Sequence, residues 1–306
     1  MQISAKELKE KLEGVGYCTN NQIVYSLWSA IMTERPLLVE GAPGIGKSSL
    51  AKALADALGL KFIQLHCYDG LTSDQTMYSY NYSLQLLALE GVKEKLAQET
   101  SGLNAADSVR HIAQAIDFFG PDFILRRPLL ESITSDSKCV LLIDELDKQN
   151  DESLEHQLLE LLDTYSMSIP EYKTIQCAPE NHPIVIITSN AYKELSGALR
   201  RRCCYLYLEQ KSQEEIVRIL QTRAKIDDVL ANGIALSYLS IQGGTVRHMP
   251  SIAELIEYSK LLQTQELSKE LVVNTLGLLI KDRRDAGVIT KAFENLPQAV
   301  IEGRGV

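Results

Sequence analysis

The sequence contains no apolar run approaching the roughly 20 residues that a membrane-spanning helix needs. Its first residues, MQISAKELKEKLEG, predict a charged amphipathic helix and lack the apolar core of a signal peptide. We therefore expect neither a membrane span nor a secretory leader, and we expect a cytoplasmic location.

Spacings typical of a metal site are also missing. The six cysteines are scattered, and the five histidines form neither a ligand pattern nor a pair with a nucleophilic serine or cysteine. Reduced thiols, several of them in the protein core, are the expected state. The cysteines are Cys18, Cys67, Cys139, Cys177, Cys203 and Cys204.

Positive charge is sparse as well, because the net charge is −9 and no long basic run stands out. This balance argues against a nucleic-acid groove as the main surface, although it leaves room for a local basic patch. The sequence also contains no internal repeat and no low-complexity tract.

One stretch, GAPGIGKSS, carries the strongest functional signal. It follows the apolar run 36–40 and opens a helix-forming segment, which is the setting that the pattern G-x-x-x-x-G-K-[ST] requires. Its glycines let backbone N–H groups turn toward phosphate oxygens, while Lys47 adds a charge for the β- and γ-phosphates and the Ser48 hydroxyl can bind Mg²⁺. The phosphate-binding residues are Gly41, Ala42, Pro43, Gly44, Ile45, Gly46, Lys47, Ser48 and Ser49.

Polar residues that complete a hydrolytic site follow two other apolar runs. Asp144 ends the run VLLID and is expected to bind Mg²⁺ together with Ser48; Glu145 is expected to activate the attacking water. The alternative for this acidic pair is a simple helix cap. Asn190 follows the run 184–188 and is expected to hold the water or touch the γ-phosphate, with ordinary turn chemistry as its alternative.

Arginines supply the remaining candidates. Arg200, Arg201 and Arg202 precede the last predicted strand, and such a cluster is either a solvated face or, in a ring, a source of one arginine that reaches a neighbour's nucleotide. Arg201 and Arg202 are favoured over Arg200. Arg247, just before a predicted helix at 250–263, is expected to contact the γ-phosphate from a second domain.

The order of these segments predicts an α/β fold in which a parallel sheet lies between two helical layers. Apolar strands alternate with helices up to residue 209, and only helices are predicted beyond it, at 212–224, 229–242, 250–263 and 267–281. We expect a nucleotide-binding domain at 1–209 and a smaller all-α lid domain at 210–306. Residues 69–135 are interpreted as an insertion with a strand at 78–82, helices at 84–98 and 108–119, and tyrosines that form a candidate partner surface. A hairpin is expected around 170–172.

With these residues in order, the chain resembles AAA+ ATPases of the MoxR type, in particular a branch that includes ATPases for carbon-monoxide-dehydrogenase maturation. The resemblance runs from about residue 16 to 262. It rests on RPLLVEGAPGIGKSSLAKALA, IQLHCYDGLTSDQTMYSYNYSLQLL, FILRRPLLESIT, VLLIDELDK, SIPEYKTI, IVIITSN, ELSGALRRRCCYLYL and MPSIAELIEY.

The resemblance implies a hexameric ring with ATP and Mg²⁺ bound between subunits. In that ring Glu145 is the Walker B glutamate, Asn190 is sensor 1, Arg201 or Arg202 is the arginine finger and Arg247 is sensor 2. Gly16-Tyr17 is expected to border the adenine. The resemblance also implies chaperone-like remodelling or metal-cofactor insertion with a partner that carries a von Willebrand factor A domain. TVRHMPSIAEL departs from the Ser-Pro-Arg form of sensor 2 that is common in the wider family.

Two other functions remain open at this point. A nucleic-acid motor on the same fold would show hydrolysis stimulated by DNA or RNA with a steep salt dependence. A nucleotide-gated signalling or defence switch would show a single turnover with very slow product release.

Overall fold

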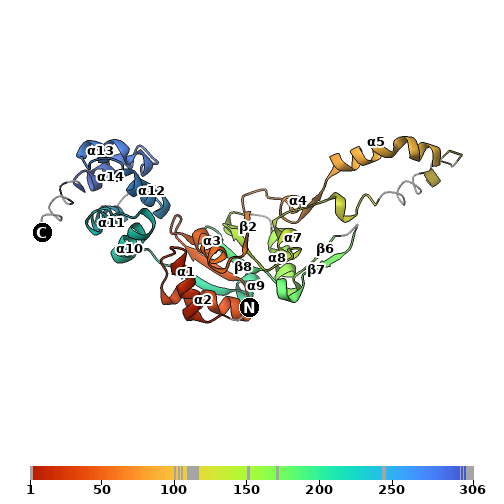
Figure 1. Cartoon of the computed structure of the whole chain (residues 1–306), viewed down its shortest axis with the longest axis horizontal. Helices are drawn as coiled ribbons and strands as arrows, with labels where there is room; N and C mark the ends of the chain where they lie inside the picture. The colour runs from red at the N-terminus through yellow and green to blue at the C-terminus, as the bar shows by residue number, and fades with distance from the viewer. Residues whose placement is uncertain are drawn as a thin grey trace.

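The computed structural model describes residues 3–99, 101–102, 104, 106–108, 117–149, 152–169, 172–242, 246–296, 298 and 300. It has three parts along its longest axis: a sheet covered by helices, a bundle of helices on one side, and a projecting arm on the other (Figure 1).

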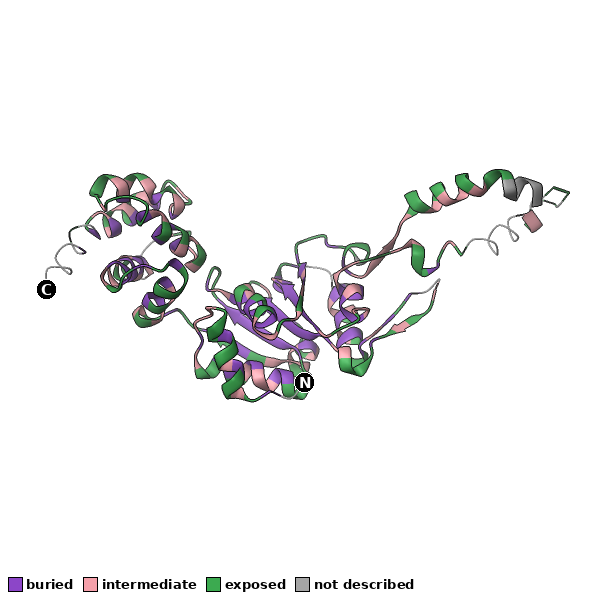
Figure 2. Cartoon of the chain, viewed as in Figure 1, coloured by how far each residue is buried: buried purple, intermediate pink, exposed green. Residues whose placement is uncertain are grey.

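The sheet has five parallel strands in the order β2-β5-β8-β1-β9. Every residue of the three inner strands is buried, because helices cover both faces and the strands are almost continuously apolar (Figure 2). The parallel sheet predicted from the sequence is thus confirmed. Its strands are β1 (Leu37–Gly41), β2 (Lys61–His66), β5 (Cys139–Asp144), β8 (Ile184–Ser189) and β9 (Cys204–Leu208).

The two faces of the sheet are covered by different helices. Helices α1 (Ala5–Gly14), α2 (Asn21–Thr33) and α3 (Lys47–Leu58) share one apolar core with one face. The second face shares its core with helices from the later part of the domain, among them one that was assigned to the insertion. These helices are α7 (Pro128–Ile133), α8 (Glu152–Thr164) and α9 (Gly197–Arg202).

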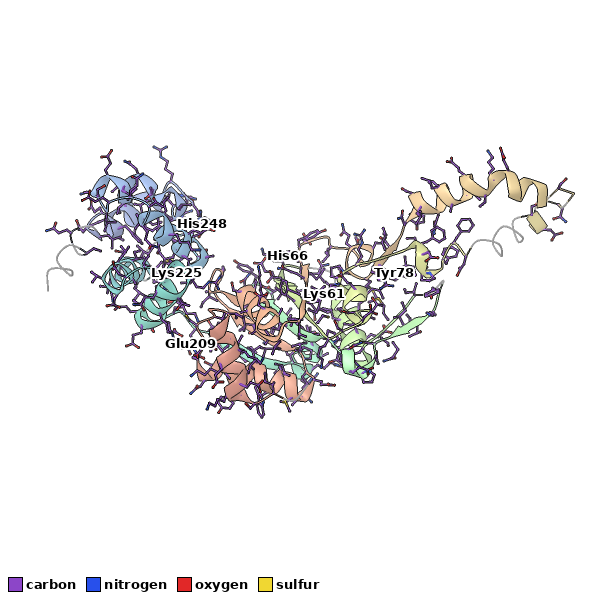
Figure 3. All side chains as sticks on the ribbon, viewed as in Figure 1. Lys61, His66, Tyr78, Glu209, Lys225 and His248 are labelled. Atoms are coloured by element: carbon purple, nitrogen blue, oxygen red, sulfur yellow. The ribbon has the colours of Figure 1, made fainter. Side chains whose placement is uncertain are left out.

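The arm is built from the segment between β2 and α7. Strand β3 (Tyr78–Tyr80) pairs antiparallel with β4 (Ile124–Arg126), and helix α5 (Tyr82–Glu99) extends away from the body (Figure 1). Tyr78 lies at the base of the arm (Figure 3), where it contacts Tyr80, which in turn contacts Phe119. Tyr78 and Tyr80 are half-buried, whereas Tyr82 at the start of α5 is 68% exposed, so only part of the expected tyrosine surface is available. The arm also exposes several leucines.

Some predictions for residues 69–135 and for the hairpin differ from the structure or lie partly outside the described residues. Helix α7 buries three apolar side chains against the sheet, so the predicted insertion extends too far at its C-terminal end. Of the helix predicted at 108–119, residues 109–116 lie outside the described residues, and 118–119 form a turn. A short helix, α4 (Ser73–Thr76), precedes the arm. The predicted hairpin pairs β6 (Ser166–Ser168) with β7 (Thr174–Gln176); residues 170–171 of its turn lie outside the described part.

The helices after β9 form a core of their own, with no side chain from the sheet among its described members. We call these helices the lid. Glu209 lies at the connection, and Lys225 and His248 lie within the lid (Figure 3). Because the two cores meet across an unpaired connection at 209–212, we propose residue 209 as the end of the first domain. The lid comprises α10 (Gln213–Ala224), α11 (Asp228–Gln242), α12 (Ile252–Leu262), α13 (Lys269–Thr275) and α14 (Ala286–Phe293).

The lid differs from its prediction in two places. The helix expected at 267–281 ends at Thr275 and continues as a short 3-10 helix at Leu276–Leu278. Helix α14 was not predicted. In the described part of the chain, no helix has the length and apolar character that a membrane crossing requires.

Candidate functional site

The glycine-rich loop joins β1 to α3 at the carboxyl end of the sheet. Gly44 and Gly46 have φ angles of 76° and 102°, a region that side chains disfavour, and these turns bring Lys47 to the first position of α3. The Lys47 ammonium is buried and donates to the carbonyls of Gly41 at 2.8 Å and Ala42 at 3.0 Å. Burial lowers the pKa of Lys47, and nearby carboxylates oppose that shift.

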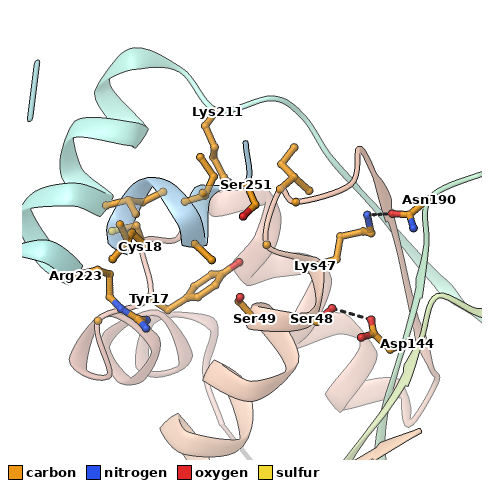
Figure 4. Close-up of a pocket in the computed structure, with 18 of the residues that line it drawn as sticks. Tyr17, Cys18, Lys47, Ser48, Ser49, Asp144, Asn190, Lys211, Arg223 and Ser251 are labelled. Carbon is orange, nitrogen blue, oxygen red and sulfur yellow. Dashed lines mark hydrogen bonds between the residues drawn. The ribbon is translucent and has the colours of Figure 1, made fainter. Parts of the chain in front are cut away.

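Asp144 lies beside the loop, at the end of β5. Its Oδ1 accepts hydrogen bonds from the hydroxyls of Ser48 at 2.7 Å (Figure 4) and Thr188 at 2.6 Å. Its Oδ2 accepts from Gln64 Nε2 at 3.2 Å and lies 3.4 Å from His66 Nδ1, a neighbour that the sequence did not single out. The carboxylate and the Ser48 hydroxyl are thus an oxygen pair of the kind that Mg²⁺ prefers.

Glu145 adopts a left-handed backbone conformation with a φ of 56°. Its N–H donates to the Thr188 hydroxyl at 2.8 Å, which ties this strained residue to the next strand. Burial raises the pKa of Glu145, but hydrogen bonds from Lys148 and Asn190 outweigh it, and the net shift is downward. Glu145 is therefore a carboxylate at neutral pH.

Asn190 joins the two charged groups. Its Oδ1 accepts from Lys47 Nζ at 2.5 Å (Figure 4). Its Nδ2 donates to Glu145 Oε1 at 2.9 Å. Asp147 holds this arrangement, because its Oδ2 accepts from the backbone N–H groups of Asn190 at 3.0 Å and Tyr192 at 2.9 Å. Asp147 was not predicted from the sequence, although its place three residues after Asp144 was a usable signal.

A cavity of about 300 Å³ opens between the loop and the lid. Tyr17 lines one end of it together with apolar lid residues, and burial raises the pKa of its phenol. The polar residues above lie at its other end (Figure 4). The full lining is Gly16, Tyr17, Cys18, Gly44, Ile45, Gly46, Lys47, Ser48, Ser49, Asp144, Glu145, Asn190, Lys211, Ile219, Arg223, Ser251, Ile252, Ala253 and Ile256.

Lys211, Arg223 and Ser251 were missed at the sequence level. They belong to the connection and the lid, and no local motif indicates which of their side chains turn toward the loop. Ser251 is the N-cap of α12 and forms a capping box with Glu254. It also touches the loop, since a Cβ on Gly44 would lie 2.9 Å from Ser251 Cβ, and the next residue, Ile252, donates its N–H to Gly44 O at 3.2 Å.

The three adjacent arginines have three different environments. Arg200 Nη2 lies 2.6 Å from Glu40 Oε1, and Arg202 pairs through two nitrogens with Asp163 at 2.5 and 2.7 Å. Arg201 is exposed and, among the described residues, pairs with no carboxylate; its Nε donates to Gly197 O at 3.1 Å. Within the described part of one chain, none of the three lines the cavity.

Arg247 does not reach the cavity either. Its side chain is exposed, its backbone N–H donates to Asp285 Oδ1 at 3.0 Å, and it is absent from the described lining. The structure therefore does not support the predicted contact with a γ-phosphate. The lid instead presents Arg223, and the connection presents Lys211.

The described residues contain no group of three or more side chains that would hold a metal ion by themselves. A metal ion at Ser48 and Asp144 therefore needs additional oxygens from a bound ligand.

The six cysteines are free thiols, and burial raises the pKa of Cys139 to about 11.

A family profile described as "ATPase family associated with various cellular activities (AAA)" matches residues 37–209, which is more than half of the chain. No curated protein matches. Similar solved structures include two point variants of RuvB from Thermotoga maritima. They are 18% and 19% identical, with TM-scores of 0.44 and 0.45; the alignments cover 95% of this chain and 70% and 69% of theirs.

A third structure, titled as the Holliday junction branch migration motor RuvB of the same organism, is 17% identical with a TM-score of 0.42. It covers 95% of this chain and 68% of its own. The profile match, which contains the loop, Asp144-Glu145 and Asn190, shows that the chain belongs to the AAA family of ATPases.

Proposed function

We propose that the chain is a MoxR-type AAA+ ATPase that hydrolyses ATP between the subunits of a hexameric ring and couples hydrolysis to work on a protein partner. The observation that carries the proposal is the Asn190 amide, which contacts both the Lys47 ammonium and the Glu145 carboxylate. These are the groups that hold phosphate and activate water in phosphoryl transfer.

The cavity fits a magnesium–nucleotide substrate. Its volume of about 300 Å³ lies at the lower end of the range for small-molecule sites, and its lining combines an aromatic and apolar end with a polar end that holds Lys47 and two carboxylates. Lys47 would hold the phosphates, and Ser48 and Asp144 would hold Mg²⁺. When bound, the ion neutralises charge on the phosphates.

Glu145 is the proposed general base. Its lowered pKa keeps it ionised, so that it orients the attacking water and accepts its proton. Asn190 holds this carboxylate on the Lys47 side, and Asp147 fixes the backbone that carries the amide.

Arg201 is the proposed arginine finger. Its two neighbours are engaged by carboxylates of their own subunit, whereas Arg201 faces solvent from the same helix. A guanidinium that is exposed and outside its own cavity suits a role at a neighbour's nucleotide, where it would stabilise transition-state charge.

The first test is Glu145→Gln, which keeps the shape of the side chain and removes its basicity. We expect ATP binding to persist and kcat to fall by about 10² to 10⁴, the range for a lost general base. Binding is measured with a fluorescent ATP analogue and turnover by phosphate release. Near-normal turnover would show that another group activates the water.

The second test concerns the ring. Arg201→Ala should lower kcat by about 10³ or more, as the loss of an arginine finger does. Mixing it with Glu145→Gln subunits, which have an inactive site but an intact arginine, should restore part of the activity. No recovery at any mixing ratio would exclude a finger that acts on the neighbouring subunit.

The partner is proposed as a protein with a von Willebrand factor A domain, with remodelling or metal-cofactor insertion as the outcome. This rests on the resemblance of the motifs to the MoxR type. Co-expression with such a protein encoded beside this chain should yield an ATP-dependent complex that Lys47→Ala abolishes. A complex that ignores nucleotide would argue against the coupling.

A further inference from the structure

A buried carboxylate directly precedes the phosphate loop. Glu40 is 6% exposed, although it is charged, and it lies on β1 next to Gly41. Arg200 Nη2 lies 2.6 Å from its Oε1 and Nη1 3.5 Å from its Oε2, while the Tyr205 hydroxyl donates to Oε2 at 2.9 Å. Both carboxylate oxygens are therefore engaged, which makes this contact stronger and more directional than a surface ion pair.

The partner of Glu40 lies on the helix that carries the proposed finger. Helix α9 is six residues long, begins at the Ser196 cap and buries Leu199 completely. Since successive residues of a helix diverge by about 100°, its three arginines point in three directions. Arg200 reaches β1, Arg202 reaches the end of α8, and Arg201 is directed outward.

The two fixed arginines differ in how firmly they hold the helix. Arg202 and Asp163 are both more than a third exposed, so their pair is screened by water. Glu40 is buried from water. It directly precedes Gly41, the loop glycine whose carbonyl accepts a hydrogen bond from Lys47. Of the two ion pairs, the Arg200 contact is thus the one that links α9 directly to the strand leading into the phosphate loop.

We propose that Glu40 and Arg200 are positioning residues, which set the placement of Arg201 toward the neighbouring subunit from the phosphate loop of their own subunit. The inference rests on the proposed ring. Breaking the pair should therefore impair the neighbour's site while leaving ATP binding by the altered subunit intact. Tyr205 supports the pair from the edge strand β9.

Glu40→Gln and Arg200→Gln test the pair from its two sides, the second without any change near the loop. Each should lower kcat about tenfold, which corresponds to one charge-assisted hydrogen bond, with the Kd for a fluorescent ATP analogue changed less than about threefold. Arg200→Lys should lose less, because it keeps the charge. Asp163→Asn, which frees the other arginine, is the matched control and should stay within about twofold of the parent.

Rings that mix two variants show whether the defect lies in the altered subunit's own site or in the site of its neighbour. Glu40→Gln and Arg201→Ala are each titrated with Glu145→Gln subunits, whose arginines are intact. Recovery of both supports the inference. Recovery of Arg201→Ala alone, or a Glu40→Gln subunit that no longer binds the analogue, places the defect in its own loop and overturns the inference. Recovery of neither overturns the finger and, with it, the inference.

Discussion

Helices α3 and α5 are both rich in leucine, yet they lie in opposite surroundings. In α3, Leu50 and Leu54 are fully buried between the sheet and α1. In α5, Leu86 and Leu87 are 64% and 68% exposed. Helix α3 packs against the sheet and begins at the site, whereas α5 belongs to the arm.

Spacing explains the difference. The buried positions of α3 recur at intervals of three and four residues, which gathers them on one face. In α5 the apolar residues follow one another around the helix, so no single face can cover them. The arm helix therefore depends on its own good helix formers and on the aromatic contacts at its base. Leucine content alone does not reveal a core.

The largest expected effect lies in the covered helix. Leu54→Ala should reduce the free energy of unfolding by about 2–5 kcal/mol, because it removes buried methyl groups and leaves a cavity under the sheet. Chemical denaturation monitored by circular dichroism measures the loss. A change below about 1 kcal/mol would contradict the burial.

An intermediate effect is expected for Lys148, which pairs with Glu145 at the carboxyl end of the sheet. Lys148→Ala removes a hydrogen bond that lowers the pKa of Glu145 and leaves burial, which raises it. The pKa should rise, so the acidic limb of the pH profile of kcat should move to higher pH.

The control for this pH measurement is Lys61→Ala. Lys61 also pairs with a carboxylate, Glu131, but outside the cavity, and its removal should leave the limb where it is. An unshifted limb in Lys148→Ala would show that Lys148 does not tune the base. Circular dichroism at each pH separates titration from unfolding.

The smallest effect is expected on the arm. The same substitution as in α3, made as Leu86→Ala with Leu87→Ala, should change the free energy of unfolding by less than about 0.5 kcal/mol, since the side chains are already in water. Denaturation under identical conditions provides the comparison. A loss as large as that of Leu54→Ala would mean that the arm folds back onto the chain.

Local sequence patterns predicted the sheet, the phosphate loop and the acidic pair, because each depends on consecutive residues. The order of strands also placed Asn190 at the carboxyl end of the sheet, where the phosphate loop lies. The pairing of Arg200 with Glu40 could not be predicted, since the two residues are 160 positions apart and no local pattern connects them. The same holds for Arg223, whose approach to the cavity depends on how the lid packs against the loop.

The contact between Gly44 and α12 has one more consequence. A helix begins with N–H groups that have no partner within it, and here the first of them, on Ile252, is satisfied by the carbonyl of Gly44. The phosphate loop thus serves as part of the cap of a lid helix. Rotation of a single peptide plane in the loop would remove that hydrogen bond, worth about 1 kcal/mol. The orientation of one carbonyl then contributes to how firmly the second domain is held against the first.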